Sequence, residues 1–421
     1  MKMIKRKVIN IFHTVFTKAI KFVSFFIPKK QNTIYCFPEW ITCLSNHVDI
    51  INYTADNVLS FINYLLRNYK GTKLTIYLFY FEFNRIDDCI NYVNLLKNDK
   101  LQIHFVLYDK NNLKSRLTQL FCFLKSKYIF TSNVLEKRFP YKLKKQIYIS
   151  LNYYAAGFKA DTLDINYPNN RNISKLPVEY VISTSLLASQ MLSTATNVPV
   201  ENFRTLGFAR NDNIINPRFS KEQLTDMLNL PFKINKIIIH TPTHRMGHNI
   251  STKKDVINYK NSFEALCTIL NKYNAILIIV PHPSEQLIMD AGKNDRIVLY
   301  KPNYQYTLYD ILPHADALLT DYTTVYYDFL LTDRPVIFNF YDKDFYEKER
   351  GFAFDPIENI CAGSIVKNVE ELFNAIQQTL EGIDVHKQHR KFVTALIHKY
   401  IDSKSSERLL VFLNNKLKET L

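Results

Sequence analysis

From residue 33 onward, short apolar runs alternate along the chain with longer amphipathic stretches. The short runs have the length of buried strands, and the longer stretches carry apolar residues at helical spacing. This βαβ alternation predicts two parallel sheets covered by helices, that is, two Rossmann-like halves. The first series of expected strands lies at 33–37, 74–81, 101–108, 128–131 and 146–151, and the second at 180–183, 236–240, 275–280, 317–320 and 335–340.

A polar stretch at residues 161–177 separates the two series, and its asparagines and prolines are typical of a linker. We therefore expect a first domain at 31–165, a second domain at 178–400 and a C-terminal helix at 401–421. Because open α/β sheets bind ligands beyond the carboxyl ends of their strands, the ligand should lie between the halves.

Residues 1–30 form a separate amphipathic segment with eight basic residues and no acidic one. Such a pattern is typical of a helix that lies in a membrane interface, and Lys18 and Lys21 interrupt the only stretch that approaches the length of a membrane span. A signal peptide does not fit this broken apolar region. The alternative is that the apolar stripe packs on the protein's own core. The stripe consists of Val8, Phe12, Val15, Ala19, Phe22 and Phe26.

Composition narrows the classes of function. The 421 residues carry a formal net charge of +15, which favours a negatively charged partner. The eight glycines form no Gly-x-Gly run, which excludes the usual dinucleotide and Walker phosphate loops. The six cysteines form no Cys-x-x-Cys pair, which argues against a zinc site and fits a reducing compartment. Nucleic acid is disfavoured, because the basic residues concentrate on an amphipathic helix rather than among a stacking platform of aromatics.

Candidate chemistry follows three strands of the second series, whose ends we expect at one crevice. The segments read HTPTHR at 240–245, PHPS at 281–284 and TDYTT at 320–324. The hydroxyls of Thr323 and Thr324 stand where a helix should begin, which predicts a phosphate site without glycine; an ordinary helix cap is the alternative. His282 has a proline on each side, which restricts its direction, although a lone histidine is more often structural.

Two further segments have competing interpretations. Arg210, in the sequence GFARND at 207–212, could offer its guanidinium to a phosphate, or the segment could be a plain turn. Asp342 and Asp344 resemble the two-aspartate metal motif of glycosyltransferases, but the match is short and we interpret it as a solvated turn.

The chain resembles the CDP-glycerol glycerophosphotransferase family of teichoic-acid and capsule polymerases. The family pattern L-I-T-D-Y-S-S-V-x-F-D-Y is matched by LLTDYTTVYYDF at 318–329, K-P-I-I-F by RPVIF at 334–338, and Y-x-x-x-R-G-F by Tyr346 with RGF at 350–352. GFARND resembles G-x-P-R-N-D, TPTHR at 241–245 resembles A-P-T-x-R, and His282-Pro283 matches H-P. Weaker similarity at Asp56-Asn57 extends the match over most of the chain outside the basic segment.

This resemblance implies a GT-B fold, in which the second half holds the cytidine diphosphate and the first half presents the acceptor. The reaction would be attack by an acceptor hydroxyl on the β-phosphorus of a CDP-activated polyol, with release of CMP. The resemblance implies a catalytic role for His282 near the diphosphate and substrate-binding roles for a larger set. That set comprises Lys159, Arg210, Asn211, Asp212, Thr243, Arg245, Asp321, Thr323, Thr324 and Arg350.

One departure affects the acceptor side. The family's W-H-G-T-P-L-K motif, whose histidine resembles a catalytic base, corresponds to YYAAGFK at 153–159, where Tyr154 stands in the histidine's place and Lys159 is kept. A neutral tyrosine is a poor base near pH 7, because its unperturbed pKa is about 10. His240 or His244 could take the proton instead, the acceptor chemistry could differ, or the protein could be a catalytically weak homologue.

The sequence thus predicts a peripheral enzyme on the cytoplasmic face of the cell membrane, bound to an anionic membrane surface. It would transfer a polyol phosphate from a CDP-activated donor to a glycopolymer or lipid-linked primer. The alternatives are a GT-B glycosyltransferase that uses a nucleotide sugar and a membrane-bound scaffold without activity. The sequence shows no motif for a protein-held metal and implies no certain cofactor, although a divalent cation could bridge the diphosphate.

Overall fold

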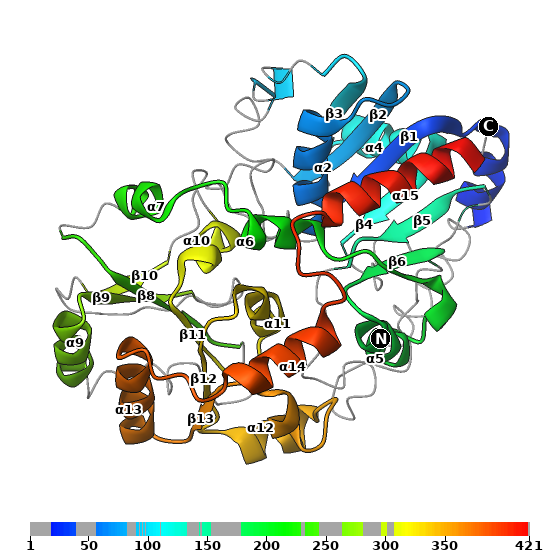
Figure 1. Cartoon of the computed structure of the whole chain (residues 1–421). Coiled ribbons are helices and arrows are strands. Elements are labelled where there is room, and N and C mark those ends of the chain that lie inside the picture. Colours follow the sequence, from blue (N-terminus) through cyan, green and yellow to red (C-terminus); the bar gives the residue numbers. More distant parts are fainter. Residues whose placement is uncertain are drawn as a thin grey trace.

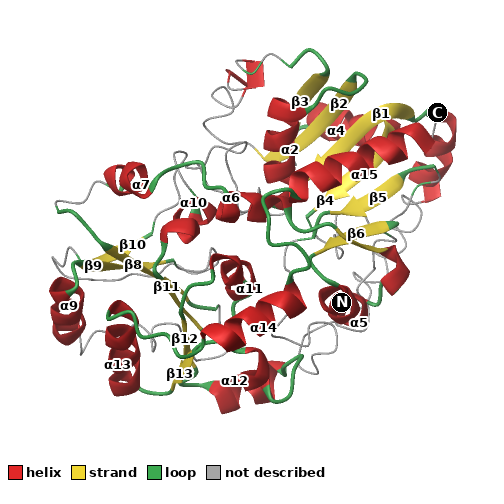
Figure 2. Ribbon diagram, viewed as in Figure 1, coloured by secondary structure: helices red, strands yellow, loops and turns green. Residues whose placement is uncertain are grey.

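The computed structural model of the chain forms two parallel β-sheets covered by helices, visible as two groups of strands in Figure 2. The two Rossmann-like halves predicted from the alternation of strands and helices are therefore confirmed. The structure describes residues 18–38, 56–81, 90–109 except 92, 95 and 97, 111–132, 143, 145–152, 178–228, 232–243, 263–280, 296–300 and 307–419.

The first sheet has seven strands in the order β3-β2-β1-β4-β5-β6-β7, and every neighbouring pair is parallel. The chain starts at β1 inside the sheet. It first adds β2 and β3 on one side of β1 and then adds β4 to β7 on the other side. The strands are β1 (Lys30–Phe37), β2 (Leu74–Phe81), β3 (Leu101–Tyr108), β4 (Ser126–Thr131), β5 (Ile147–Ser150), β6 (Tyr180–Ser183) and β7 (Phe203–Thr205).

The second sheet has six parallel strands in the order β10-β9-β8-β11-β12-β13. This order places the carboxyl ends of β9, β8 and β11 side by side. The strands are β8 (Lys236–Thr241), β9 (Ala275–Ile279), β10 (Ile297–Leu299), β11 (Ala317–Thr320), β12 (Val336–Asn339) and β13 (Ser364–Val366).

The prediction that the second series begins with the strand at 180–183 is wrong. This segment is β6, and it pairs with β5 in the first sheet, with Ile149 opposite Tyr180. The expected boundary at residue 178 rested on the polar stretch before it, but polar composition is shared by interdomain linkers and by loops within one sheet. The chain passes between the sheets after β7 instead.

Helices cover both sheets. On the first sheet, α2 and α15 lie side by side on one face, although more than 300 residues separate them in the sequence (Figure 1). The helices are α2 (Asn57–Asn68), α4 (Leu113–Lys125), α5 (Leu186–Thr196), α6 (Asp212–Ile215), α7 (Lys221–Met227), α9 (Phe263–Lys272), α10 (Leu308–Ile311), α11 (Val325–Phe329), α12 (Lys343–Arg350), α13 (Val369–Leu380), α14 (Lys387–Ile397) and α15 (Ser405–Glu419).

The core follows from the alternation of side chains along each strand. In β1, Ile34 and Cys36 face one cluster, whereas Tyr35 and Phe37 face another that α4 and α5 complete. The cluster around Ile34 also contains residues of the second sheet, among them Ile237. The two halves therefore share one continuous core.

Residues 18–26 of the amino-terminal segment are helical. Ile20 is buried against the first sheet, but Phe22, Phe25 and Phe26 are 69%, 67% and 66% exposed. The alternative that the stripe packs on the core therefore does not hold for Phe22 and Phe26. Among the described residues, no helix is both long enough and apolar enough to cross a bilayer.

Candidate active site at the strand ends

The carboxyl ends of β8 and β11 meet as the sequence predicts. Thr241 lies opposite Thr320 in the register, and their hydroxyl oxygens are 3.1 Å apart. On the other side of β8, the Val280 N–H donates to the His240 carbonyl at 2.8 Å, so the chain leaves β9 beside β8. Thr241 and Thr320 thus lie together at one sheet edge, and β9 ends beside β8 at Val280. Residues 244–245 and 281–284 lie outside the described residues.

Asp321 joins two of these segments. Its carboxylate accepts hydrogen bonds from the Thr243 backbone N–H at 2.9 and 3.1 Å and from the Thr243 hydroxyl at 2.5 Å. It also accepts from the Tyr322 N–H at 2.6 Å, and Asp321 and Thr243 are both buried. Because a buried carboxylate with several donors is held rigidly, Asp321 fixes the β8 and β11 ends relative to each other.

Thr323 and Thr324 precede α11, where a helix start was expected. Thr324 is the N-cap residue, yet its side chain makes no capping hydrogen bond. The Thr323 hydroxyl accepts from the Val325 N–H at a long 3.5 Å. Both residues are half-buried. An ordinary side-chain cap therefore does not explain Thr324, although its role in phosphate binding stays a prediction.

An aromatic stack behind this turn is a feature that the sequence analysis missed. The Tyr322 ring stacks on Tyr346 of α12 with centroids 3.9 Å apart and on Phe340 with centroids 5.0 Å apart. Phe352 also packs against Tyr322. The spaced motif Y-x-x-x-R-G-F carried the signal, because it places Tyr346 and Phe352 around the end of one helix. The stack brings α12, whose last residue is Arg350, to the β11 turn.

His240, one of the alternative bases, lies within β8 and is 3% exposed. Such burial separates its ring from solvent, and its role as a base stays a prediction. Five further predicted site residues lie outside the described residues, so the structure does not place them. They are Tyr154, Lys159, His244, Arg245 and His282.

Arg210 lies where the chain crosses from the first sheet to the second. Its guanidinium donates to the Asp328 carboxylate of α11 at 2.7 Å, and both side chains are buried. Burial alone would lower the pKa of Arg210, but the charge and hydrogen bond of Asp328, together with Tyr309 and Asp56, outweigh burial and raise the pKa. The predicted contact of Arg210 with a phosphate stays untested, and the structure gives its charge a partner inside the protein.

Of the two residues that follow Arg210, Asp212 also has partners within the protein. Asn211 is buried, and Asp212 accepts hydrogen bonds from the Ser405 and Ser406 N–H groups, both at 2.8 Å. Asp212 therefore caps the start of α15. Burial raises the pKa of Asp212, although these hydrogen bonds oppose the rise.

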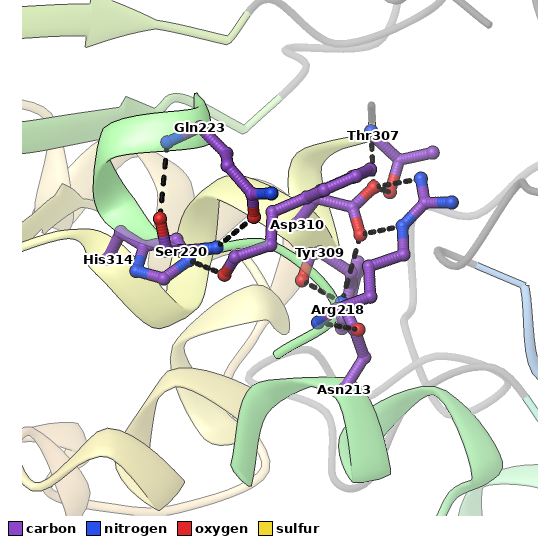
Figure 3. A network of polar contacts seen from close by, with 9 residues as sticks. Asn213, Arg218, Ser220, Gln223, Thr307, Tyr309, Asp310 and His314 are labelled. Atoms are coloured by element: carbon purple, nitrogen blue, oxygen red, sulfur yellow. Dashed lines mark hydrogen bonds and ion pairs between the residues drawn. The ribbon is translucent and has the colours of Figure 1, made fainter. Parts of the chain in front are cut away.

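The segment after the crossing is fastened to the second half by a polar network around Asp310 (Figure 3). Arg218 forms a bidentate ion pair with Asp310, with distances of 2.6 and 2.7 Å. The Asn213 amide donates to the Tyr309 carbonyl at 2.7 Å, and the Thr307 N–H donates to Asp310 at 2.7 Å. The network fixes the crossing segment to the second half rather than to the first.

The corresponding edge of the first sheet holds Asp56 and Asn57. Asp56 caps α2 by accepting from the Val58 N–H at 2.7 Å, and it accepts from the Ser132 hydroxyl at 2.6 Å. Burial raises the pKa of Asp56 despite these hydrogen bonds. Asn57 donates to the Asn152 carbonyl at 2.7 Å, at the end of β5.

Within the described part of the chain, no three His, Cys, Asp or Glu side chains gather where they could hold a metal ion. At the two-aspartate segment, Asp342 lies in a turn and accepts from the Tyr322 hydroxyl at 3.2 Å. Lys343 and Asp344 begin α12, and Lys343 forms an ion pair with Glu358 at 2.8 Å. The segment is thus a turn that leads into a helix.

Comparison with known sequences decides the family. The profile of the family described as CDP-glycerol:poly(glycerophosphate) glycerophosphotransferase matches residues 47–415, which include every predicted site residue. The chain belongs to this family. The match confirms the resemblance that the motifs at 318–329 and 334–338 carried.

Curated relatives of this family member include a primase and a transferase of teichoic acid. The teichoic acid glycerol-phosphate primase of Bacillus subtilis is 31% identical over 198 residues, which cover 47% of this chain and 48% of that protein. The teichoic acid glycerol-phosphate transferase of Staphylococcus aureus is 27% identical over 235 residues, which cover 55% of this chain and 59% of that protein. The matches thus span about half the length of these relatives.

Solved structures agree on the fold. A variant of the wall teichoic acid polymerase TagF superposes with a TM-score of 0.69 over 100% of this chain and 99% of that chain, at 16% sequence identity. A putative UDP-N-acetylglucosamine 2-epimerase of Listeria monocytogenes gives a TM-score of 0.54 at 14% identity, covering 93% of this chain and 97% of that one. Together with the two parallel sheets, this match confirms the GT-B fold.

Proposed function

We propose that this protein transfers a polyol phosphate, with glycerol phosphate as the first candidate, from a CDP-activated donor to a teichoic acid type of acceptor. The acceptor hydroxyl attacks the β-phosphorus, the bond from that phosphorus to the bridging oxygen breaks, and CMP leaves with that oxygen. The hydroxyl proton passes to a base. The related TagF has been solved with CDPG, which supports a CDP-linked donor.

The observation that carries this proposal is the joined edge of β8 and β11. Charge in such a transfer spreads over the phosphoryl oxygens, so fixed hydrogen-bond donors supply most of the stabilisation. The half-buried Thr323 and Thr324 lie two and three residues after Asp321, which holds this turn against Thr243. Hydrogen-bond donors on a rigid turn need little reorganisation when negative charge develops on the phosphoryl oxygens.

The decisive experiment incubates the protein with CDP-glycerol, CDP-ribitol or nucleotide sugars in the presence of a teichoic acid primer. We expect CMP from a CDP-polyol. Release of a nucleoside diphosphate from a nucleotide sugar would instead support the glycosyltransferase alternative. Nucleotide binding without turnover on any acceptor would support an inactive scaffold. His282→Ala should abolish CMP release while the unfolding midpoint stays unchanged, and wild-type rates in that variant would remove His282 from the mechanism.

We propose further that the enzyme acts as a peripheral protein on an anionic membrane surface, where a lipid-linked primer would be available. Support comes from Phe22, Phe25 and Phe26, which are exposed beside the basic residues Lys18 and Lys21. On the same face of the first sheet, α4 exposes Leu113, Leu117 and Phe121 at a spacing of one turn, and Lys29 donates to the Leu124 carbonyl near the end of α4. Each basic residue near an anionic leaflet contributes about 1 kcal/mol.

Vesicle sedimentation tests this part of the proposal. A variant in which Phe22, Phe25 and Phe26 are all changed to Ser should no longer bind vesicles that contain anionic lipid. Its stability should not fall, because all three side chains are exposed. Phe392→Ser is the matched control, because Phe392 is 60% exposed but lies on α14 in the second half. Equal binding of the triple variant and the control would contradict membrane docking through this helix.

A further inference from the structure

A chain of buried hydrogen bonds connects the two halves. The Asn57 side chain donates to the Asn152 carbonyl at 2.7 Å and accepts from the Arg210 N–H at 3.1 Å. The Arg210 guanidinium then pairs with Asp328 at 2.7 Å. All four residues are at most 4% exposed. The connection is therefore shielded from solvent and from screening by salt.

The two ends of this connection stand next to the two parts of the proposed site. Asn152 directly precedes the stretch 153–159, which contains Tyr154 and Lys159. Asp328 belongs to α11, the helix that follows Thr323 and Thr324. A displacement of Arg210 would therefore shift Asn152 at the end of β5 and the donor-side turn relative to each other.

We propose that Arg210 is a positioning residue, which holds the acceptor edge of the first sheet and the donor edge of the second sheet at the separation that transfer requires. This inference rests on the proposed function. The surroundings of Arg210 suit a fixed spacer better than a mobile ligand contact. Its guanidinium lies 5.4 Å from the centroid of Phe208 and 5.0 Å from that of Tyr309, and the Tyr309 hydroxyl donates to the same Asp328 oxygen.

The expected effect is on the rate of transfer rather than on donor binding. A misplacement of reacting groups by about 1 Å costs about 10²-fold in rate. Donor affinity depends on groups of the second half alone, which keep their places when only the connection to the first half is cut. A contact of Arg210 with the diphosphate would give the opposite pattern, with weakened donor binding.

The main test is the double variant Arg210→Met with Asp328→Asn. Changing both partners avoids an uncompensated buried charge, so the fold should survive. We expect kcat for CMP release to fall about 10²-fold while KM for CDP-glycerol stays within about twofold of wild type. Hydrogen exchange should become faster in peptides that cover residues 57–62 and 208–216, because residue 210 is no longer anchored to α11 through the ion pair with Asp328.

Asn57→Ala is a second variant that cuts the same connection and leaves the buried charge pair intact. It should give the same fall in kcat and the same faster exchange at 208–216. The control is Arg390→Met with Asp384→Asn. Arg390 is also fully buried and paired with Asp384 at 2.6 Å, but its partners Asp384 and Asp333 both lie in the second half. This control should leave kcat and exchange at 57–62 unchanged.

Two results would overturn the inference. One is wild-type kcat and exchange in both the double variant and Asn57→Ala. The other is a tenfold or larger rise in KM for CDP-glycerol with kcat unchanged, which would place Arg210 on the donor. If the wild-type protein itself releases no CMP, the proposed function fails, and the exchange measurements still decide whether Arg210 couples the two halves.

Discussion

The two sheets present polar residues at the same kind of edge, but these residues have different tasks. At the second sheet, Asp321 joins one strand end to another, and Thr324 follows with a hydroxyl that makes no capping bond. At the first sheet, Asp56 caps α2. Asn57 donates a hydrogen bond to the backbone at the end of β5 and accepts one from the crossing segment. The first edge is therefore occupied by the protein's own structure, whereas we propose that the second keeps donors for the diphosphate of the donor. Variants can test whether this division holds.

Among the variants that compare the two edges, the largest effect is expected at Asp321. Asp321→Asn replaces the acceptor of the Thr243 N–H and hydroxyl by an amide, which can satisfy fewer of these donors. CMP release should fall about 10²-fold, because the β8 and β11 ends are no longer held together. The measurement is kcat at saturating CDP-glycerol.

Asp316→Asn is the control for Asp321, because Asp316 lies at the amino end of the same strand. There it accepts from the Ile237 N–H at 2.9 Å and pairs with Lys221 at 3.0 Å. The control should keep its activity. If both variants lost activity equally, the carboxyl edge would have no special role.

Thr324 gives the next largest effect. Thr324→Ala should lower kcat/KM for CDP-glycerol about tenfold or more, since a hydrogen bond to a charged group contributes about 1.5–3 kcal/mol. The urea midpoint should stay unchanged, because the hydroxyl caps no helix N–H. Thr324→Ser should retain activity. A loss of stability with unchanged kinetics would instead assign Thr324 to the helix alone.

A variant at Asp212 tests the structural role of the first half, because Asp212 caps α15, which packs on the first sheet. Asp212→Ala removes the acceptor of the Ser405 and Ser406 N–H groups and should lower the free energy of unfolding by about 1–2 kcal/mol, the usual loss for a helix cap. Hydrogen exchange should rise along α15. Asn368→Ala, which removes the cap of α13 in the second half, should cost a similar amount while α15 stays protected. Equal exchange of α15 in the two variants would contradict this assignment.

The smallest effect is a change in pH dependence near α11. Burial lowers the pKa of His398, although its hydrogen bond to the Tyr327 carbonyl opposes the shift. A folded-state pKa below the unfolded value of about 6.5 means that the unfolded chain binds more protons, so stability falls as pH drops through and below that value. His398→Gln should flatten this slope in urea midpoints between pH 7 and 5. An unchanged slope would show that other groups cause it.

The sequence predicted the second half better than the first, and the reason is physical. The strand ends at 240–245 and 320–324 carry hydroxyls and a carboxylate within a few residues of apolar strands, so local pattern reveals them. The hydrogen bond between Asn57 and Arg210 joins residues far apart in the chain, and neither periodicity nor composition predicts such a contact. The same limit explains the error at β6, because a polar stretch has the same composition whether it leads to a new sheet or to the next strand.

The place of α15 has a consequence for synthesis of the protein. Leu409, Leu413 and Leu417 are buried in the same cluster as Ile34 and Val58 of the first half. The ribosome therefore has to make nearly all of the second half before the first sheet receives this helix. Domains usually fold in the order of their synthesis, but here the half that emerges first is completed last. Until then, the apolar face of the first sheet that α15 later covers stays exposed and is available to chaperones.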